Sequence, residues 1–362
     1  MLKKTIRRLG ALAMVLAMAV SVFAVSASAA DEATDTNYDV ISRFKKTVTV
    51  DEKNPTTAPT TSFTYEVKKA GAQATMTVGN STFVDIKAGL NDNDVVLSET
   101  AFTSTASVSA EYVANGNISV KKNAYTQPGI YHYTVKEVIP ENQYDGITYD
   151  TNTYNLYVFA VTGTNGIAVD KIIMTDTAGT SKVQGFTNDY GKTYNKTHDV
   201  IITKNVTGNM GETNKEFKFD IKVTSAHEEY YKVVYSVDGT AAKEQTVWVK
   251  SNDTTAKQVG IMHNGYIHIY GLSENDTYVV TEHDYAADGY ETFVKYGDAE
   301  KKTKTATATA KVTRDNSAVE VENNKTTTSP TGVIMNIAPY ALMVVVAGAF
   351  AVVFLSRRNR AE

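Results

Sequence analysis

The sequence of 362 residues predicts an all-β protein with two tandem immunoglobulin-like β-sandwich domains. Short segments rich in Val, Ile, Thr, Tyr and Phe alternate with polar residues and are separated by Gly, Asn and Asp, which is typical of strands joined by turns. About 300 residues lie between two terminal signals, which is a usual length for two domains. The expected strands include Thr47–Val50, Phe63–Val67, Tyr154–Val161, Phe217–Val223 and Tyr266–Tyr270.

The first 30 residues have the three parts of a secretory signal peptide. A basic start that includes Lys3 and Arg8 precedes the apolar run 9–25, and Ala27-Ser28-Ala29 supplies the small residues of a cleavage site. An uncleaved membrane anchor is the alternative, but the cleavage pattern and the polar stretch after it favour removal. We therefore expect residues 1–30 to be a signal peptide and the mature chain to be exported.

The C-terminal end combines a polar motif, an apolar segment and a basic tail. Residues 333–355 are apolar apart from Asn336, are long enough to cross a bilayer core of about 30 Å as a helix, and are followed by Arg357, Arg358 and Arg360. The motif Ser329-Pro330-Thr331-Gly332 lies immediately before this predicted transmembrane segment. The three parts together resemble a sortase sorting signal. Its usual pattern is Leu-Pro-x-Thr-Gly, whereas here Pro330 directly precedes Thr331, as in a Val-Pro-Thr-Gly variant, so the sortase class stays open.

Composition and motifs exclude several classes of function. The chain has no cysteine, which excludes disulfides, catalytic thiols and thioesters, and its net charge of −4 gives no basic patch for nucleic acid. It contains no Gly-rich phosphate loop, no G-x-S-x-G and no H-E-x-x-H, so we expect neither an enzyme nor a cofactor. His263 and His268 fall on an aromatic strand without a carboxylate at metal-ligand spacing, and Asp92-Asn93-Asp94 lacks the glycine and distant glutamate of a calcium loop. We expect no metal site.

An internal repeat of four landmarks divides the mature chain into two halves. A lysine-bearing strand comes first, two aromatic segments follow, the second of them ending in Glu, and an Asn closes each half. In the first half the landmarks are Phe44–Val48, Phe63–Tyr65, Tyr133–Glu137 and Phe186–Asn188. In the second half they are Ile202–Val206, Phe217–Phe219, Tyr278–Glu282 and Val321–Asn323. We expect domains at residues 31–190 and 191–325, a boundary in the polar, strand-poor stretch 189–199, and a linker with the sorting signal at 326–362.

Strand parity places six polar residues of these landmarks on core faces. Side chains alternate between the two faces of a strand, so residues of equal parity share a face with their apolar neighbours. The residues are Lys46, Glu137 and Asn188 in the first half and Lys204, Glu282 and Asn323 in the second. A shift of register by one residue would put Lys45 or Asn324 inward instead. A lone buried charge costs several kcal/mol, so each of the six should be neutral, paired or consumed.

A buried Lys, Glu and Asn together favour one reaction. Burial lowers the pKa of a lysine and raises that of a glutamate, which favours a neutral amine beside a protonated acid. The amine is then a nucleophile, and the acid, hydrogen-bonded to the Asn amide, can polarise its carbonyl and transfer protons as ammonia leaves. The product is an intramolecular Lys–Asn isopeptide bond, formed once in each half, with Glu137 and Glu282 as the assisting residues.

These landmarks resemble the streptococcal pilin isopeptide-linkage family over nearly the whole mature chain. The similar segments are Lys46–Thr49, Tyr133–Glu137, Tyr149–Tyr154, Phe186–Asn188, Thr203–Gly208, Tyr278–Glu282 and Asn323. The resemblance implies Cna-B-type sandwiches and a major pilin of a Gram-positive bacterium, with the isopeptide triads Lys46/Glu137/Asn188 and Lys204/Glu282/Asn323.

The same resemblance implies how the subunits assemble. A pilin sortase would join Thr331 to a lysine of an identical subunit, and a housekeeping sortase would attach the covalent homopolymer to peptidoglycan after a transiently membrane-anchored precursor stage. The linking lysine implied is Lys182, with Lys192 and Lys196 as alternatives. A minor pilin or monomeric wall-anchored adhesin that binds a host surface ligand is the first rival interpretation, and an exported enzyme with β-sandwich appendages is the second.

Overall fold

The computed structural model describes residues 37–51, 55–191, 197–297, 302–311 and 317–326, together with Met343. Within these ranges the regular structure is strand apart from two short 3₁₀ turns, η1 (Ala241–Lys243) and η2 (Ala286–Asp288), and the single helical residue Met343. The predicted all-β fold is therefore confirmed. None of the helical residues that the structure describes belongs to a helix long and apolar enough to span a membrane. The predicted signal peptide and, apart from Met343, the predicted transmembrane segment lie outside the described residues.

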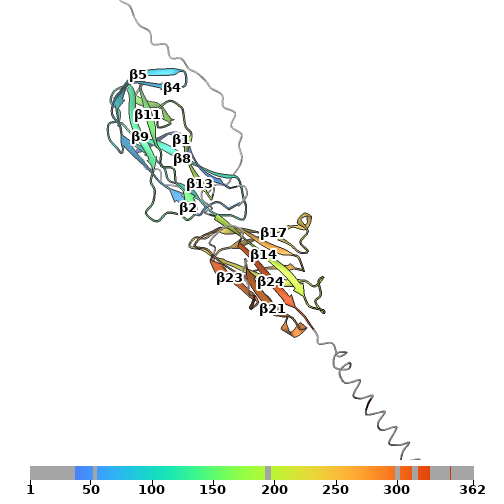
Figure 1. The fold of residues 1–362 in the computed structure, drawn as a ribbon. Coiled ribbons are helices and arrows are strands. Elements are labelled where there is room, and N and C mark those ends of the chain that lie inside the picture. The colour runs from blue at the N-terminus through green and yellow to red at the C-terminus, as the bar shows by residue number, and fades with distance from the viewer. Residues whose placement is uncertain are drawn as a thin grey trace, which may run out of the picture. The chain divides into compact units, whose positions relative to one another are not determined.

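The strands of the first half form three sheets (Figure 1). Their bounds are β1 (Tyr38–Val50), β2 (Thr61–Phe63), β3 (Tyr65–Lys69), β4 (Gln73–Val78), β5 (Ser81–Ala88), β6 (Val95–Leu97), β7 (Thr100–Phe102), β8 (Glu111–Lys121), β9 (Gly129–Glu137), β10 (Ile147–Thr148), β11 (Thr153–Gly163), β12 (Gly166–Thr175) and β13 (Gly185–Tyr190). One sheet has the order β10-β13-β1-β8-β6. The second has the order β12-β11-β9-β5-β4, with β3 also paired to β9, and β2 pairs with β7.

The strands of the second half form two further sheets. Their bounds are β14 (Thr197–Thr207), β15 (Phe217–Thr224), β16 (Tyr230–Ser236), β17 (Gln245–Lys250), β18 (Lys257–Ile261), β19 (Tyr266–Ser273), β20 (Thr277–Glu282), β21 (Glu291–Tyr296), β22 (Thr303–Lys304), β23 (Thr307–Lys311) and β24 (Ser317–Asn324). The orders are β17-β16-β19-β14-β24-β21-β22 and β18-β15-β20-β23. Each sheet takes its described strands from one half of the chain alone, so the protein has two β domains.

Two details of the predicted strands were wrong. The segment expected as one strand from Phe63 to Val67 is broken at Thr64, and β2 and β3 on either side pair with different strands. The stretch 189–199 was expected to be poor in strands, but β13 continues to Tyr190 and β14 begins at Thr197. Polar side chains do not prevent pairing there, because the backbone of Asp189 and Tyr190 lies in register with Thr49 and Val50 of β1.

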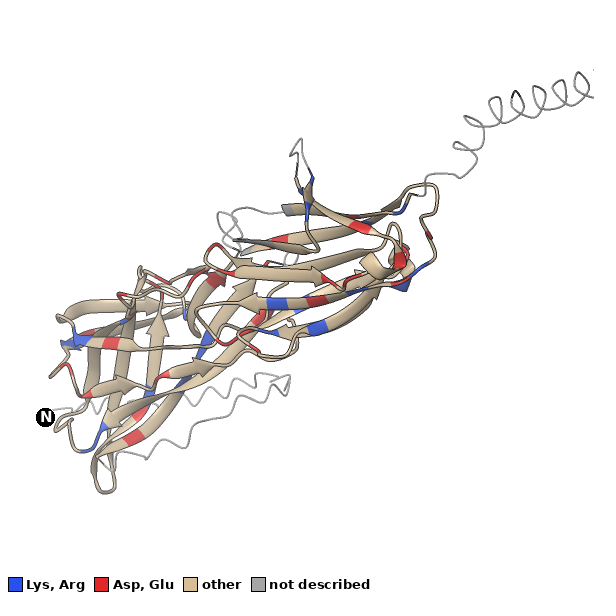
Figure 2. Ribbon diagram, turned by 90° about the horizontal axis from the view of Figure 1, so that it is seen from below, with Lys and Arg blue, Asp and Glu red and all other residues tan. Residues whose placement is uncertain are grey.

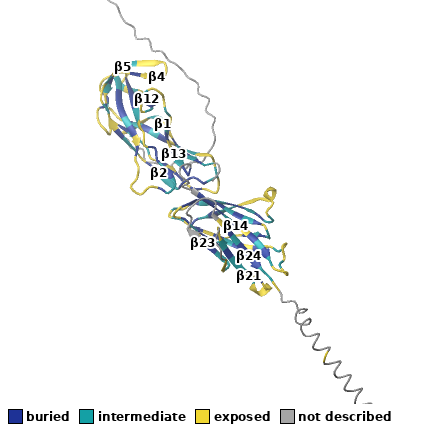
Figure 3. Cartoon of the chain, viewed as in Figure 1, coloured by how far each residue is buried: buried dark blue, intermediate teal, exposed yellow. Residues whose placement is uncertain are grey.

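Each core lies between the faces of two sheets. In the second domain, Ile202 on β14 and Ile269 on β19 pack in one cluster with Ile221 on β15 and Val280 on β20, so both sheets contribute side chains. Figure 3 shows the buried residues following the inner strands of both domains, while the exposed residues concentrate in turns and edges. Acidic and basic residues are interspersed along the strands (Figure 2), which agrees with the small net charge.

One buried carboxylate, Glu229, contacts tyrosines from both domains. Tyr144 and Tyr190 of the first domain donate hydrogen bonds to Oε1, and Tyr231 donates to Oε2 at 2.9 Å. Burial raises the pKa of Glu229, and the hydroxyl donors oppose that effect. The sequence analysis did not find this residue, because nothing in its neighbourhood of the sequence distinguishes it from a solvated glutamate.

Gly116 provides a test of the packing in the first core. It lies on β8 opposite Phe44, and a Cβ atom there would be 2.2 Å from the Phe44 ring. We expect Gly116→Ala to lower the free energy of unfolding by about 1–3 kcal/mol, because the ring must move out of its packed position. Denaturant unfolding followed by circular dichroism would measure the loss. Gly71→Ala is the matched control, since a Cβ at the exposed Gly71 meets nothing within 4 Å; equal effects of the two changes would contradict the described packing.

Candidate functional site: a buried lysine, glutamate and asparagine in each domain

The first domain brings Lys46, Glu137 and Asn188 into direct contact in its core. Lys46 lies on β1, Asn188 on the neighbouring strand β13, and Glu137 at the end of β9 in the facing sheet. The three residues are 0, 3 and 1% exposed. Lys46 Nζ contacts Oε2 of Glu137, and Asn188 Nδ2 donates to Oε1 of the same carboxyl group at 2.7 Å. Glu137 therefore bridges the amine and the amide.

The second domain contains the corresponding arrangement with looser contacts. Lys204, Glu282 and Asn323 are 1, 2 and 0% exposed. Lys204 Nζ lies 3.6 Å from Oε1 of Glu282 and donates to the backbone carbonyls of Asn205 at 3.0 Å and Val321 at 3.3 Å. Asn323 Nδ2 donates to Oε1 of Glu282 at 3.0 Å. The glutamate again contacts both other members of the group.

The strand register that produces the two sites is the same. The first and last strands of each domain, β1 with β13 and β14 with β24, pair in parallel. Asn188 is the register partner of Val48, two residues after Lys46, and Asn323 is the partner of Val206, two residues after Lys204. Residues two apart share a strand face, so the lysine and the asparagine point to the same side of the sheet. The internal repeat seen in the sequence thus corresponds to one repeated geometry.

An aromatic ring lies beside each amine. Lys46 Nζ is 4.4 Å from the centre of the Phe63 ring, and Lys204 Nζ is 4.6 Å from that of Phe217. A ring face attracts a cation, but it supplies no acceptor to replace water. The aromatic landmark of each half therefore forms a wall of the site.

Burial moves the pKa values of the lysines and the glutamates toward each other. Desolvation lowers the pKa of Lys46 and of Lys204 from 10.5 to about 8, and the neighbouring glutamate opposes this change in both cases. Desolvation raises the pKa of Glu137 and Glu282, opposed chiefly by the lysine. A neutral amine beside a protonated acid is thereby brought closer in energy to the ion pair.

The register alternatives Lys45 and Asn324, and the predicted linking lysine Lys182, lie outside the two sites. Lys45 is exposed on the other face of β1, and Asn324 is only half-buried at the end of β24. Lys182 is exposed between β12 and β13, where its backbone forms an isolated bridge with Thr175. Lys192, Lys196 and the motif 329–332 fall outside the described residues.

Two polar contacts at the sites were missed by the sequence analysis. The backbone N–H of Asp150 donates to Oδ1 of Asn188 at 2.8 Å, and Thr292 Oγ1 donates to Oε2 of Glu282 at 3.1 Å. The segment Tyr149–Tyr154 had been noted as a landmark, but no role was attached to it. A backbone donor leaves no residue-type signal, so only the fold could show it.

The expectations about the histidines need one correction. His263 lies in the turn between β18 and β19 and not on a strand, and its Nδ1 accepts from the backbone N–H of Val206 at 3.0 Å. His268 is on β19, where Nε2 lies 2.5 Å from Oδ2 of Asp199, a carboxylate distant in the sequence. The part of the chain that the structure describes contains no group of three or more His, Asp or Glu residues that could hold a metal ion. In the acidic segment Asp92-Asn93-Asp94, Oδ2 of Asp94 accepts a hydrogen bond from the backbone N–H of Asn91 at 2.9 Å.

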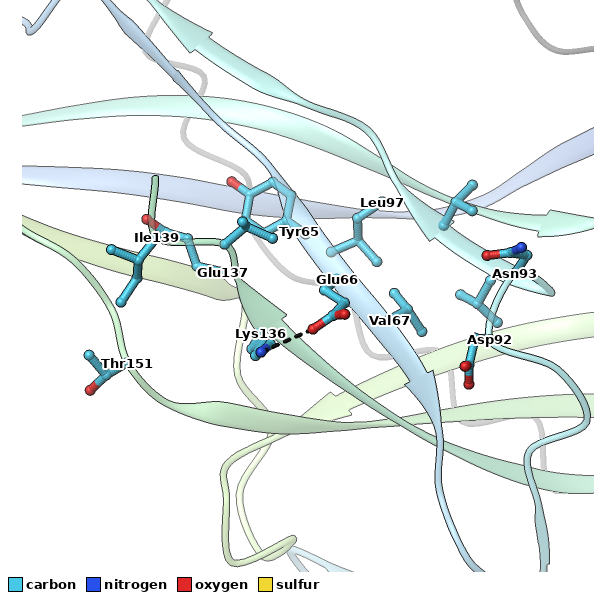
Figure 4. A pocket seen from close by; sticks show the side chains of 13 residues that line it. Tyr65, Glu66, Val67, Asp92, Asn93, Leu97, Lys136, Glu137, Ile139 and Thr151 are labelled. Carbon is cyan, nitrogen blue, oxygen red and sulfur yellow. Dashed lines mark ion pairs between the residues drawn. The ribbon is translucent and has the colours of Figure 1, made fainter. Parts of the chain in front are cut away.

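A groove in the first domain leads to Glu137 (Figure 4). Its volume is about 830 Å³, and its lining includes Tyr65, Val67, Leu97 and Ile139 as well as Glu137. Glu66 and Lys136 form an ion pair of 3.0 Å in the same lining. The carboxyl group of Glu137 is itself covered, so the groove approaches the site without exposing it.

Comparisons with known proteins agree with this arrangement. Residues 28–191 match the family model of the Spy0128-like isopeptide containing domain, and residues 198–325 match a domain of unknown function. A pilin of Streptococcus pyogenes serotype M1 is 24% identical over 242 residues, which cover 65% of this chain and 69% of that protein.

Two solved structures share the fold. The major pilin of Streptococcus pyogenes has a TM-score of 0.55 at 18% identity and covers 80% of this chain and 99% of its own. The major pilin T3.2 of Streptococcus pyogenes serotype GAS13637 has a TM-score of 0.51 at 20% identity and covers 81% of this chain and 100% of its own. The chain therefore has the two-domain fold of these pilins.

The buried lysines predict how stability depends on pH when the amines are free. Between pH 8 and 10 a lysine with a folded pKa of about 8 has lost its proton, whereas the unfolded chain, with a pKa of 10.5, still holds it. The unfolded state then binds more protons, so stability rises with pH in this window. The change from 10.5 to about 8 is equivalent to up to about 3 kcal/mol for each lysine.

The measurement uses an Asn188→Ala, Asn323→Ala variant, in which the amines have no amide to attack. We expect its free energy of unfolding, from urea titrations at pH 7, 8, 9 and 10, to increase over this range. The same variant with Lys46→Met and Lys204→Met is the control and should lack the increase. A flat or falling profile in the lysine-containing variant would show that the amines are not desolvated.

Proposed function

We infer, from the membership of residues 28–191 in the Spy0128-like isopeptide containing domain family and from the pilin-like fold of the chain, that this protein is a structural pilus subunit and not an enzyme. We propose that each domain is closed by one autocatalytic isopeptide bond, Lys46–Asn188 and Lys204–Asn323. The observation that carries the proposal is the position of Glu137, whose two oxygens contact the amine and the amide nitrogen separately.

This position gives each oxygen of Glu137 a step in the reaction. The neutral Lys46 amine attacks Cγ of Asn188 and forms the Nζ–Cγ bond, and Oε2 takes the proton that Nζ releases. The tetrahedral intermediate then collapses and the Cγ–Nδ2 bond breaks. Oε1, 2.7 Å from Nδ2, gives the proton of the carboxylic acid to the departing nitrogen, in exchange for the proton that Oε2 has taken. The products are a secondary amide and ammonia, and Glu137 ends in the protonation state in which it began.

The fold supplies most of what this reaction needs. The core holds the reactants together, so the attack is effectively unimolecular, and it excludes the water that would solvate the lysine charge. In the second domain Glu282 also contacts both partners, but through one oxygen: Oε1 lies 3.6 Å from Lys204 Nζ and 3.0 Å from Asn323 Nδ2.

We further propose that the subunits are polymerised by a pilin sortase through Thr331 and Lys182 and are finally attached to peptidoglycan. Exposure of Lys182 beside the closing strand β13 supports its role. The division into domains at 31–190 and 191–325 and their immunoglobulin-like, Cna-B-type topology belong to the same proposal, supported by the separate sheets of the two halves. The protein would then be an exported component of the pilus on the cell surface.

Intact mass tests the cross-links. We expect the exported part of the chain, residues 31–328, to be lighter than its sequence by two ammonia molecules, and the Glu137→Ala, Glu282→Ala variant to have the full mass. Lys46→Ala should restore one ammonia, whereas the control Lys45→Ala, on the exposed face of the same strand, should restore none. An unshifted mass of the unaltered protein would remove the isopeptide proposal.

Polymerisation is tested by coexpression with a pilin sortase. Lys182→Arg keeps the charge but removes the acceptor amine, so we expect it to abolish the ladder of covalent oligomers on a denaturing gel. Lys192→Arg and Lys196→Arg should leave the ladder intact. Loss of the ladder in one of these two and not in Lys182→Arg would reassign the linking lysine. If no sortase yields a ladder from the unaltered chain, the protein is a monomeric wall-anchored adhesin instead of a shaft subunit.

A further inference from the structure

The two site asparagines, Asn188 and Asn323, differ in the hydrogen bonding of their side-chain oxygens. Oδ1 of Asn188 accepts the backbone N–H of Asp150 at 2.8 Å. Oδ1 of Asn323 is also buried, but it has no hydrogen-bond partner among the residues that the structure describes. Attack by an amine turns this oxygen into the oxyanion of the tetrahedral intermediate, so a fixed donor at this position acts on the reaction itself.

The amide orientation of Asn188 is set by its surroundings. Nδ2 points to the carboxyl group of Glu137, which accepts, and Oδ1 points to the N–H of Asp150, which can only donate. A reversed amide would place Nδ2 against the Asp150 N–H, which are two donors, and Oδ1 against the accepting oxygen of Glu137, which are two acceptors. The hydrogen-bond network therefore aims the carbonyl oxygen at the Asp150 N–H before the reaction begins.

The segment that carries the donor is held by its own side chain. Asp150 is 7% exposed, and its Oδ1 accepts from the backbone N–H of Asn152 at 2.9 Å and from Asn152 Nδ2 at 2.8 Å. Its Oδ2 accepts from the Tyr154 hydroxyl at 2.6 Å and from the backbone N–H of Thr187, next to Asn188, at 3.5 Å. The carboxylate thus fixes the turn against β13, the strand that carries the reacting amide.

We propose that the Asp150 N–H is an oxyanion donor for isopeptide formation in the first domain, and that the Asp150 carboxylate is the positioning group that holds it there. This inference rests on the proposed cross-linking reaction. The donor contacts the oxygen on which negative charge develops when the Lys46 Nζ–Cγ bond forms. The negative charge on the oxygen disappears when the carbonyl forms again and ammonia leaves. The second domain lacks this donor within the described residues and serves as an internal reference.

The test compares the rates of the two bonds in one chain. Residues 31–328 are recovered from inclusion bodies in denaturant, and a full intact mass at time zero establishes that neither bond is present. The chain is refolded by dilution and quenched at intervals, and each cross-linked peptide is quantified by mass spectrometry after digestion. Loss of one oxyanion donor costs about 100- to 1000-fold in enzymes. Asp150→Ala loosens the donor without deleting it, so we expect the Lys46–Asn188 bond to form at least about 10-fold more slowly and the Lys204–Asn323 bond at an unchanged rate.

Three further variants separate chemistry from folding. Asp150→Asn keeps the backbone N–H and an oxygen for the turn, so it should restore most of the rate, and Tyr154→Phe, which removes one contact to the carboxylate, should give a smaller decrease. Asp176→Ala is the matched control, because Asp176 also holds a turn of the first domain, through Thr180 N and Ser181 N, away from the site. Circular dichroism of each variant in a Lys46→Ala background, which cannot form the bond, verifies that the domain is folded under the assay conditions.

The rates of the variants separate the donor from the charge of Asp150 and from a purely structural role. The Asp150 charge opposes the lowering of the Lys46 pKa by burial and adds to the raising of the Glu137 pKa by burial. Asp150→Ala and Asp150→Asn both remove this charge, so a difference between their rates reports the donor. The inference is overturned if Asp150→Ala and Asp176→Ala slow the first bond equally, or if Asp150→Asn is as slow as Asp150→Ala. Absence of both bonds from the unaltered protein would instead refute the cross-linking reaction itself, so the two failures are distinguishable.

Discussion

The contact between a buried lysine and a buried glutamate is the constraint on which both domains depend. Removing an ammonium and a carboxylate from water costs several kcal/mol for each ion, and their attraction compensates for this only with close geometry and further hydrogen bonds. The lysine comes from one sheet of each sandwich and the glutamate from the other, so the contact holds only when the two sheets pack in one relative position. In the proposed reaction, conversion of the amine to an amide would remove the charge from the core.

The position of the proposed cross-links agrees with a mechanical role. In each domain the lysine and the asparagine lie on the first and last strands, which are parallel neighbours. Tension applied to the two ends of a domain would otherwise pull these strands apart through backbone hydrogen bonds alone. A covalent bond between them transmits the force past the rest of the domain. By the chain-entropy model for disulfides, closing a loop of about 140 residues also stabilises the folded state by about 5 kcal/mol, without allowance for strain.

The sequence predicted the burial of the six site residues better than their surroundings. Parity within strands is a property of the local backbone, so Lys46 and Asn188 could be placed on the core face by counting from Phe44 and Phe186. The break at Thr64 could not be predicted, because it depends on which strands β2 and β3 pair with. Glu229 could not be predicted either, since Tyr144 and Tyr190, two of its three tyrosine partners, are far from it in the sequence. Long-range pairing decides these features, and a single sequence contains no direct signal of it.

The unequal surroundings of the two asparagines point to two ways of making the same bond. Among the described residues, Oδ1 of Asn188 has a hydrogen-bond donor and Oδ1 of Asn323 has none. A hydrogen bond to a neutral carbonyl strengthens when the oxygen becomes charged, and only that increase accelerates the reaction. In the proposed reaction the first domain would thus stabilise its transition state with a fixed donor. The second holds Glu282 with Thr292 and leaves the amide oxygen without that donor, while the shared register of lysine and asparagine keeps the reaction the same.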